Sequence, residues 1–143
     1  MPRDSHKQTY KTDAIEVTFE PKICIHAARC VMGLPNVFRP EERPWVHLQN
    51  ATTDEIAEVV MTCPTGALEF HRLDGGPQEE PDAQPTIEPR PNGPLFVRGD
   101  LDIIDASGTV VRHVTRAALC RCGGSENKPF CDGTHRRIGF RAP

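Results

Sequence analysis

Three cysteines and one histidine lie close together toward the C-terminal end of the sequence. They are Cys120, Cys122, Cys131 and His135, and glycines and a proline are interleaved with them. Such a segment buries little apolar surface, so it needs another source of folding free energy. Thiolates and imidazole are ligands for soft and borderline metals, and metal binding can supply that free energy. The residue types and their clustering therefore predict a metal centre held by these four side chains.

Zinc and disulfide bonds are the alternatives for this segment. Zinc also binds sets of three cysteines and one histidine, but its sites commonly open with two cysteines separated by two to four residues. Here Cys120 and Cys122 are separated by Arg121 alone. Six cysteines could form three disulfides, but such frameworks belong to secreted proteins, and we expect an intracellular protein without a signal peptide.

A second set of cysteines lies in the first half of the chain. Cys24 and Cys30 share one short segment, and Cys63 directly precedes a proline. Bacterial ferredoxins carry the run C-x2-C-x2-C and a later cysteine followed by proline. Ala27 occupies the middle position of that run, so one corner of a cubane cluster lacks a cysteine. This leaves a [3Fe–4S] cluster, or a [4Fe–4S] cluster completed by His26; three buried structural cysteines are the alternative.

The elements around these cysteines are predicted from periodicity and turn residues. In the first half we expect strands at 15–19, 45–48 and 67–70, and a helix from Thr52 or Thr53 to about Met61 with Glu55 in a capping box. In the second half we expect strands at 95–98, 101–104 and 109–114, with a turn at 105–108. Asp132 is expected to be the N-cap of a short helical turn that contains His135.

A proline-rich stretch divides the sequence. Residues 74–94 contain six prolines and three glycines, and no helical or strand period is visible in them. Prolines at this density favour an extended, semi-rigid spacer. We therefore predict three parts: a domain at residues 14–73, a linker at 74–94 and a second domain at 95–143.

Both cysteine sets resemble known iron–sulfur families. The string from Cys120 to His135, with C-x-C, then serine, then P-x-C-D-G-T-H, resembles the CDGSH iron–sulfur domain of the mitoNEET family. That resemblance implies a [2Fe–2S] cluster on Cys120, Cys122, Cys131 and His135, and an intertwined homodimer. The segment 14–70 resembles a divergent single-cluster bacterial ferredoxin, in which loss of the middle cysteine commonly accompanies a [3Fe–4S] cluster.

Taken together, the sequence predicts an α+β protein with a small ferredoxin-like α+β lobe and a β-rich CDGSH lobe whose cluster-binding loop is irregular. We expect a cytoplasmic, non-enzymatic electron-transfer protein, because no nucleophile elbow, phosphate loop or dinucleotide fingerprint is present. The alternative is a module for iron–sulfur cluster transfer or for redox and pH sensing. The redox partner or apo-acceptor is not identifiable from the sequence.

Composition excludes other classes of partner. The formal net charge is −3 and the hydrophobic fraction is 37%. No global positive charge points to nucleic acid, and no apolar run is long enough to span a membrane. The remaining histidines, His6, His47, His71 and His113, have no neighbouring cysteine and are expected at the surface or in hydrogen bonds.

Overall fold

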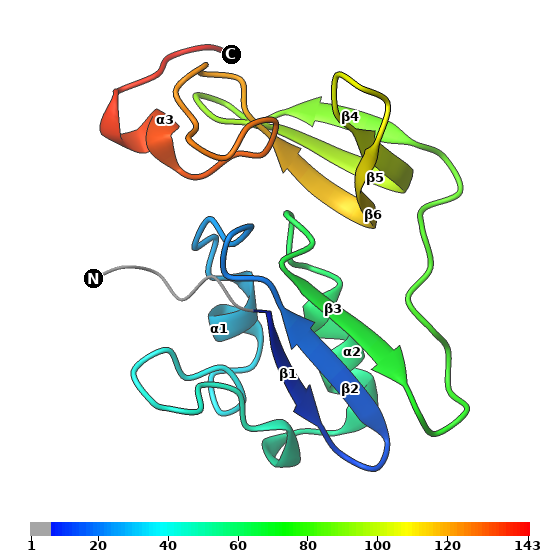
Figure 1. Cartoon of the computed structure of the whole chain (residues 1–143). Coiled ribbons are helices and arrows are strands. Elements are labelled where there is room, and N and C mark those ends of the chain that lie inside the picture. The colour runs from blue at the N-terminus through cyan, green and yellow to red at the C-terminus, as the bar shows by residue number, and fades with distance from the viewer. Residues whose placement is uncertain (1–6) are drawn as a thin grey trace. The chain divides into compact units, whose positions relative to one another are not determined.

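The structure is a computed structural model that describes residues 7–143, so His6 lies outside the described residues (Figure 1). The chain groups into two compact units. The first unit contains the residues up to Pro21, His26–Cys63 and Ala67–Glu79. The second unit contains Lys22–Ile25, Pro64–Gly66 and Glu80–Pro143. Each unit has its own antiparallel sheet.

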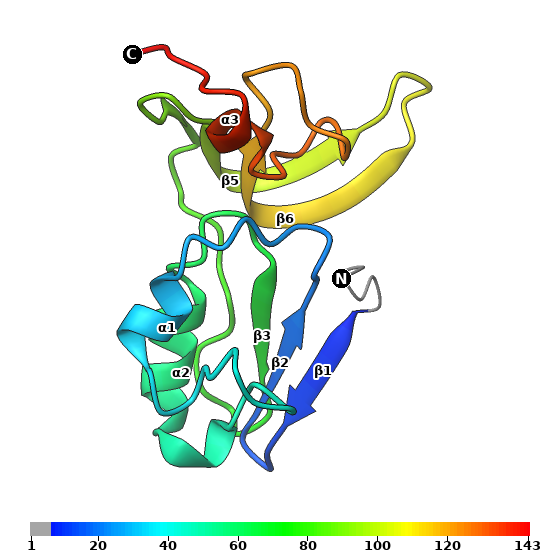
Figure 2. The same ribbon diagram turned by 90° about the vertical axis from the view of Figure 1, so that its left-hand side faces the viewer.

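The first unit combines a three-stranded sheet with short helices on one of its faces, as Figure 2 shows. The strand order is β1-β2-β3, and both pairs are antiparallel. The elements are β1 (Gln8–Lys11), β2 (Ile15–Phe19), α1 (Arg29–Gly33), the 3-10 helix η1 (Leu48–Asn50), α2 (Thr53–Val60) and β3 (Leu68–Arg72).

The core of the first unit lies between the sheet and α2. Ile15 and Val17 on β2, Leu68 on β3 and Ile56 and Val60 on α2 are all buried. The period of two on β2 and of four on α2 points these side chains to the same side, as burial on one face requires. With Val37, Phe38, Val46 and Leu48, they form the buried core of this unit.

The N-terminus of α2 matches the sequence prediction. The Thr52 hydroxyl accepts a hydrogen bond from the Glu55 N–H, and the Glu55 carboxylate accepts one from the Thr52 N–H. This reciprocal pair is the capping box, and it satisfies two main-chain donors that the helix cannot satisfy itself. Hydrogen bonds to Thr52 lower the pKa of Glu55 below its usual value.

The strand expected at residues 45–48 was wrong. Val46 forms only an isolated bridge with Phe38, and Leu48 begins the 3-10 helix η1. Trp45 instead packs its ring against Phe19 and Phe38, with ring centroids 4.8 and 5.7 Å away. The apolar pattern therefore reports burial in a folded loop rather than a strand.

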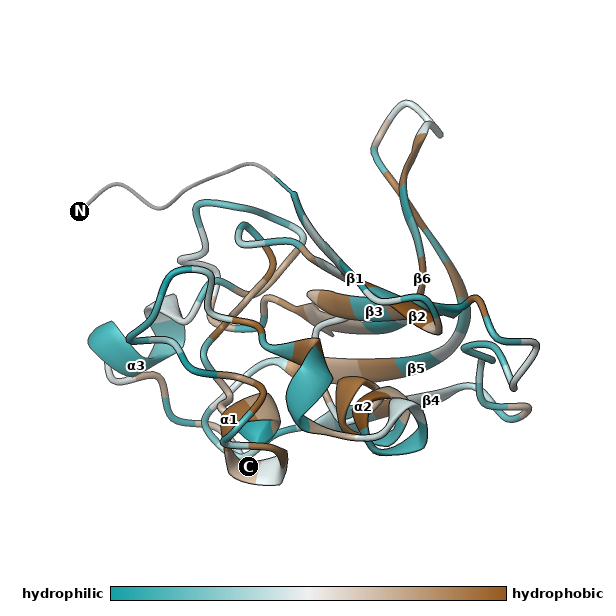
Figure 3. Cartoon of the chain, turned by 90° about the horizontal axis from the view of Figure 1, so that it is seen from below, coloured by the Kyte–Doolittle hydropathy of each residue, from teal (hydrophilic) through white to brown (hydrophobic). Residues whose placement is uncertain are grey.

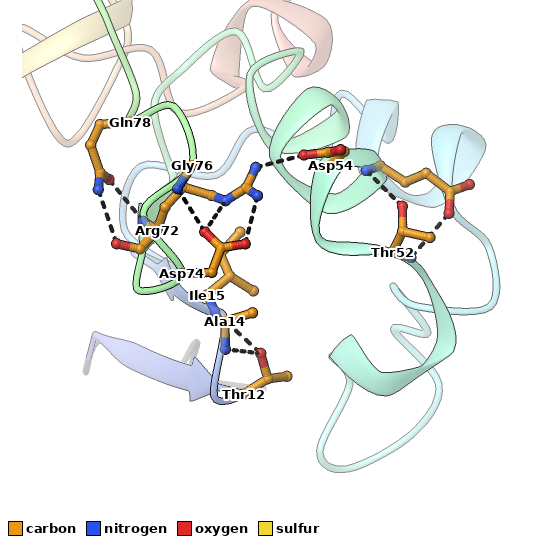
Figure 4. Close-up of polar contacts among 10 residues, drawn as sticks. Thr12, Ala14, Ile15, Thr52, Asp54, Arg72, Asp74, Gly76 and Gln78 are labelled. Carbon is orange, nitrogen blue, oxygen red and sulfur yellow. Dashed lines mark hydrogen bonds and ion pairs between the residues drawn. The ribbon is translucent and has the colours of Figure 1, made fainter.

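Arg72 closes the end of the sheet in the first unit (Figure 4). Its guanidinium donates two hydrogen bonds to Asp74, of 3.0 and 2.7 Å, and one to Asp54, of 2.8 Å. The Arg72 main chain also exchanges hydrogen bonds with the amide of Gln78. Arg72 is 8% exposed. This cluster joins the end of β3 to the first turn of α2 and to the turn that follows β3.

The second unit contains the other sheet, in the order β4-β5-β6. Its elements are β4 (Thr86–Pro89), β5 (Leu95–Ile104), β6 (Val110–Leu119) and α3 (Thr134–Arg137). β4 lies inside the stretch expected to be a spacer, so the expectation that no strand forms there was wrong for residues 86–89. The domain boundaries themselves stay a prediction.

The two strands expected at residues 95–98 and 101–104 are one strand, β5. Its pairing with β6 shifts register between Arg98 and Leu101, so a bulge at Gly99 and Asp100 interrupts the side-chain alternation. The strand expected at 109–114 continues as β6 to Leu119. The extension of β6 to Leu119 places the end of the strand directly before Cys120, the first predicted ligand.

The structure is an α+β fold with a β-rich second unit, as the sequence predicted. Among residues 7–143, no helix combines the length and apolarity needed to cross a membrane. The histidines without a neighbouring cysteine were expected at the surface or in hydrogen bonds. His47 lies 2.8 Å from Glu42, His113 lies 2.6 Å from Asp102, and His71 is exposed on β3.

Candidate metal centre

The cysteine loop of the second unit begins where β6 ends and returns to the same strand. The Cys120 N–H donates to the Pro129 carbonyl, and the Cys131 N–H donates to the Ala118 carbonyl, both at 2.8 Å. Leu119 and Phe130 form a β-bridge between these two bonds. The loop is therefore closed at its base, which holds Cys131 beside the end of β6 although ten residues separate it from Cys120.

The four predicted ligands form two close pairs. The sulfur atoms of Cys120 and Cys122 are 3.9 Å apart, and the Cys131 sulfur is 3.5 Å from Nδ1 of His135. Two ligands on one tetrahedral metal are separated by about 3.8 Å for two sulfurs and about 3.5 Å for sulfur and nitrogen, given metal–ligand bonds of about 2.3 and 2.05 Å. Each pair therefore has the spacing of two ligands on a single metal ion.

The pairs do not merge into one larger group. Within residues 7–143, no three side chains of histidine, cysteine, aspartate or glutamate are placed to share a single metal ion. The four ligands surround a small pocket. The pocket is lined by Gly93, Pro94, Cys120, Arg121, Cys122, Ser125, Cys131, Asp132, Thr134 and His135.

Asp132 organises the loop between Cys131 and His135. Its carboxylate accepts hydrogen bonds from the Thr134 N–H and hydroxyl through one oxygen, and from the Glu126 N–H through the other. The prediction that Asp132 is the N-cap of the helical turn was wrong, because the cap position is Gly133 with φ of 88°. A left-handed φ favours glycine, and it lets the chain turn sharply between Cys131 and His135.

Small residues let the two halves of the loop approach closely. A Cβ atom on Gly124 would lie 2.8 Å from the Thr134 methyl group and 3.7 Å from the Cys122 sulfur. The Ser125 hydroxyl donates to the Phe130 carbonyl at 2.5 Å and accepts from the Asn127 N–H. Glycine and serine in this loop therefore serve packing and hydrogen bonding, which fixes where the sulfur atoms lie.

Main-chain N–H groups point at the cysteine sulfurs. The Gly124 N–H donates to the Cys122 sulfur and the Gly133 N–H donates to the Cys131 sulfur, both at 3.4 Å. Burial raises the pKa of Cys120, but hydrogen bonds from main-chain N–H groups outweigh it, so the pKa lies below its usual value. Burial raises the pKa of Cys131 above its usual value. The loop thus favours a thiolate at Cys120 more than at Cys131, where burial opposes the charged form.

His135 presents Nδ1 to Cys131 from the single turn of α3. Burial and the positive charge of Arg136 lower the pKa of His135. A neutral imidazole is the form that binds a metal, so the environment favours a ligand at neutral pH. The residue is only half-buried, and its other nitrogen faces Gly93.

The residues that sequence reasoning missed are those around Arg121. The Arg121 guanidinium donates to main-chain oxygens of Arg90 and Gly93, which lie in the turn between β4 and β5. That turn was assigned to the spacer. The dipeptide Asn92-Gly93 is a turn signal that could have revealed it.

The N-terminal set of cysteines comes from three separate segments of the chain. Cys30 is the second residue of α1, and Cys63 follows α2. Both pack against the core of the first unit. Cys24 lies in the segment Lys22–Ile25, which groups with the second unit. Its participation with Cys30 and Cys63 in one site stays a prediction. No disulfide joins any of the six cysteines, all of which are within residues 7–143.

The loop at the vacant cysteine position has an uncommon backbone. His26 and Ala28, on either side of Ala27, have left-handed φ values of 59° and 62°. Residues other than glycine rarely adopt this conformation, and it tends to concentrate at functional sites. The backbone is thus tightly wound at the position where the ferredoxin run would place its second cysteine.

Comparisons with known proteins cover both halves of the chain. Residues 10–73 match the family described as "Divergent 4Fe-4S mono-cluster", and residues 92–136 match "Iron-binding zinc finger CDGSH type". The chain is also 31% identical over 67 residues to "Uncharacterized protein YjdI" of Escherichia coli (strain K12), covering 47% of this chain and 88% of that protein. The same-named protein of Escherichia coli O157:H7 matches equally.

The chain belongs to the divergent 4Fe-4S mono-cluster family and carries a CDGSH domain. The predicted fusion of the two families is therefore confirmed, and with it the broader statement that this is an iron–sulfur protein. The CDGSH match contains all four residues of the two ligand pairs, and the mono-cluster match contains Cys24, Cys30 and Cys63. Iron–sulfur domains of these kinds are typical of redox proteins.

Proposed function

We propose that this protein transfers single electrons through two different iron–sulfur clusters and that it is not itself an enzyme. A [2Fe–2S] cluster is assigned to Cys120, Cys122, Cys131 and His135. This group would supply one-electron redox chemistry. His135, a neutral ligand in place of a thiolate, would raise its potential, as histidine ligands do in Rieske centres.

The pairing of the ligands is the observation that supports this proposal. A [2Fe–2S] cluster has two irons, and each takes two protein ligands. The distances of 3.9 Å within the Cys120–Cys122 pair and 3.5 Å within the Cys131–His135 pair suit one iron each. N–H groups directed at Cys122 and Cys131 would stabilise the anionic sulfurs. A single zinc ion would instead require all four ligands to converge on one point.

The second cluster is assigned to Cys24, Cys30 and Cys63. Three cysteines suit a [3Fe–4S] cluster, and His26 is a candidate fourth ligand for a [4Fe–4S] cluster. The match to the mono-cluster family supports a cluster here, and the wound backbone at His26 and Ala28 supports the loop as its binding site. Thiolate ligands at both sites also favour a reducing compartment such as the cytoplasm.

Low-temperature EPR of the anaerobically purified protein, with iron, sulfide and zinc analysis, tests the assignment. Oxidised [2Fe–2S] and [4Fe–4S] clusters give no signal, whereas an oxidised [3Fe–4S] cluster is paramagnetic. We expect a signal in the isolated protein and a second signal after reduction. Silence before reduction with iron present would favour His26 as a fourth ligand or an empty first site. Zinc without iron would contradict the redox function altogether.

Cluster transfer to an apo-acceptor is a second candidate, and the half-buried position of His135 favours it. A ligand that water reaches can dissociate when it is protonated, and the cluster would then be released. Incubation with an apo-ferredoxin distinguishes the two candidates. Reversible redox cycling without loss of absorbance supports electron transfer, whereas redox-controlled appearance of the cluster on the acceptor supports donation.

We further propose a homodimer formed through the CDGSH lobe. β4 pairs only with the part of β5 up to Arg98, so beyond that point β5 and β6 form a two-stranded ribbon. Ile104 and Val110 on this ribbon are 55% and 51% exposed, and Figure 3 shows hydrophobic segments reaching it. Exposed apolar residues on unpaired strand edges favour pairing with a second copy.

Sedimentation of two variants tests the dimer. Ile104→Glu and Val110→Glu should each convert the protein to a monomer, because each would bury a charge in the contact between the two copies. Ile87→Glu is the matched control, since Ile87 is 69% exposed on β4 and lies outside the ribbon. A wild-type protein that sediments as a monomer would exclude this dimer.

A further inference from the structure

Arg121, which separates the first two cysteines of the CDGSH loop, has an uncommon set of partners. Its Nε donates to the Gly93 carbonyl at 2.9 Å, and Nη2 donates to the Arg90 carbonyl at 2.7 Å. Nη1 donates to a main-chain oxygen of Pro143 at 3.0 Å, and Nη2 also lies 3.5 Å from the Ala142 oxygen. A single side chain thus bridges two segments that are far apart in the sequence, the turn 90–94 and the residues 140–143.

These two segments also bond to each other. The Asn92 N–H donates to the Ala142 oxygen at 2.7 Å, and the Ala142 N–H donates to the Asn92 side-chain oxygen at 3.0 Å. The Phe140 ring lies against the guanidinium, 5.4 Å from its central carbon to the ring centroid. The Arg121 guanidinium therefore lies between the turn 90–94 and the segment 140–143 and contacts both.

The turn reaches the cluster site itself. Gly93 and Pro94 line the pocket that contains the four ligands. A Cβ atom on Gly93 would lie 3.7 Å from Nε2 of His135, so the turn lies beside the nitrogen of His135 that does not face Cys131. Movement of the turn would therefore change the immediate surroundings of His135.

The chemistry of this position suits arginine and no other residue. The guanidinium is a planar fork with five N–H donors, which lets it serve several carbonyls at once, whereas lysine offers a point charge on a flexible stem. Hydrogen bonds from a charged donor are stronger than neutral ones. The main chain on both sides of Arg121 carries ligands, so its anchoring also restrains the Cys120 and Cys122 sulfurs.

We propose that Arg121 is a positioning residue that clamps the turn 90–94 and the segment 140–143 over the cluster site and so slows loss of the bound cluster. This proposal rests on the proposed [2Fe–2S] site. The clamp acts through main-chain contacts, because Arg121 places its guanidinium on carbonyls rather than on a ligand atom.

Arg121→Lys in the full-length, cluster-loaded protein is the central test. Lysine keeps the positive charge and loses the fork, so an electrostatic role predicts no change whereas a clamp predicts a clear one. We expect the cluster absorbance to decay roughly tenfold faster in the presence of a chelator, equivalent to about 1.4 kcal/mol. Amide exchange at residues 90–94 and 140–143 should accelerate, and the EPR spectrum of the reduced cluster should shift.

Two further variants isolate the clamp from general destabilisation. Arg98→Lys is the matched control, since Arg98 lies on β5 and pairs with Asp82; it should leave all three readouts unchanged. Phe140→Ala removes the ring from the guanidinium without touching the cysteine loop and should reproduce a smaller part of the Arg121→Lys effect.

The outcomes separate this proposal from the proposed function. A wild-type protein without an iron–sulfur cluster overturns both. A wild-type protein that holds the [2Fe–2S] cluster, together with an Arg121→Lys variant that loses it at the wild-type rate, overturns the clamp alone. Faster cluster loss with unchanged amide exchange at 90–94 and 140–143 also overturns the clamp, because a local effect on the cysteine loop would then be responsible.

Discussion

In the first unit, nine apolar side chains form one buried cluster, and Cys30 and Cys63 lie at its edge. In the second unit, the buried apolar side chains are two isoleucines, two valines, two alanines, one phenylalanine and Cys131 itself. The first unit thus has an apolar core, which its sheet and the helix α2 bury between them. The second also buries apolar side chains, but one of them is Cys131, a predicted ligand, so the site lies within its core.

The difference extends to how the ligands are held. In the second unit, Cys120, Cys122 and Cys131 lie in one short loop whose hydrogen bonds are local, such as those of Asp132 and Ser125. In the first unit, Cys30 on α1 and Cys63 after α2 come from segments far apart in the sequence, and both pack against the same core. We therefore expect a bound metal to contribute to the folding of the CDGSH loop in the second unit, and to bind to an already folded core in the first.

Removal of both clusters should affect the two units unequally, and this is the largest effect we expect. After reduction and chelation, amide exchange at residues 120–135 should accelerate by at least roughly tenfold, because metal binding supplies much of the folding free energy of such loops. Exchange in β2, β3 and α2 should change little. Hydrogen-exchange mass spectrometry of the full chain measures both. Loss of protection in the first sheet would show that its core also depends on a cluster.

His135→Cys tests the ligand that distinguishes the second unit. A thiolate adds negative charge, so the potential of the cluster should fall, and the imidazole that can leave on protonation is gone. Because burial lowers the pKa of His135, wild-type protonation and cluster loss should occur as pH falls below the usual histidine range.

Absorbance decay between about pH 5 and 6 measures this, and the variant should be slower by roughly tenfold or more. His113→Cys is the matched control, because His113 pairs with Asp102 on the exposed part of the hairpin. An unchanged pH dependence in His135→Cys would show that His135 is not the labile ligand.

Ala27→Cys restores the missing cysteine of the first unit and sharpens the comparison from the other side. The variant should bind one more iron per chain, and the signal of the oxidised protein should disappear as the site becomes [4Fe–4S]. Iron analysis and EPR measure both. Ala28→Cys, one residue out of register, should leave the cluster unchanged. The same iron content in Ala27→Cys and wild type would mean that the corner is already filled or that the loop does not bind a cluster.

What the sequence could predict follows the same division. The loop from Cys120 to His135 was predictable because its ligands and turn residues lie within one short string. The capping box at Thr52 and Glu55 was predictable for the same reason. Whether Cys24 joins Cys30 and Cys63 depends on tertiary packing, and spacing along the chain does not determine that.

The strands that sequence reasoning missed lack a burial pattern. Every residue of β4 (Thr86–Pro89) is exposed, and its place is set by main-chain pairing to β5. It is an edge strand, where proline is tolerated, so the proline-rich composition did not exclude it. β1 (Gln8–Lys11) likewise has no fully buried residue. The turn 90–94 follows β4 and is marked by Asn92-Gly93, but its contact with Arg121 depends on tertiary packing, which spacing along the chain does not determine.

The smallest effect we expect is on melting temperature, from the hydrogen bonds of Arg72. It tests whether side chains stabilise the first unit independently of a bound iron–sulfur cluster. The hydrogen bonds from Arg72, followed by the Gly76 N–H, lower the pKa of Asp74 to about 2. A depressed carboxyl pKa stabilises the folded state above the unfolded pKa of about 3.9, and this contribution disappears as pH falls toward the folded value. Asp74→Asn should therefore lower the melting temperature of the first unit by a few degrees at neutral pH and by less near pH 2.

Asp54→Asn is the matched control on the same guanidinium. Asp54 accepts one hydrogen bond and its side chain is 87% exposed, whereas Asp74 accepts two from Arg72 and one from Gly76. Its loss should matter less, since exposed ion pairs contribute little. Both variants should keep the absorbance of the CDGSH cluster. Equal effects of the two variants, or an Asp74→Asn effect that persists unchanged into acid, would contradict the assignment of acid sensitivity to Asp74. An Asp74 effect that appears in the cluster-free protein as well would locate this part of the stability of the first unit in its own side chains.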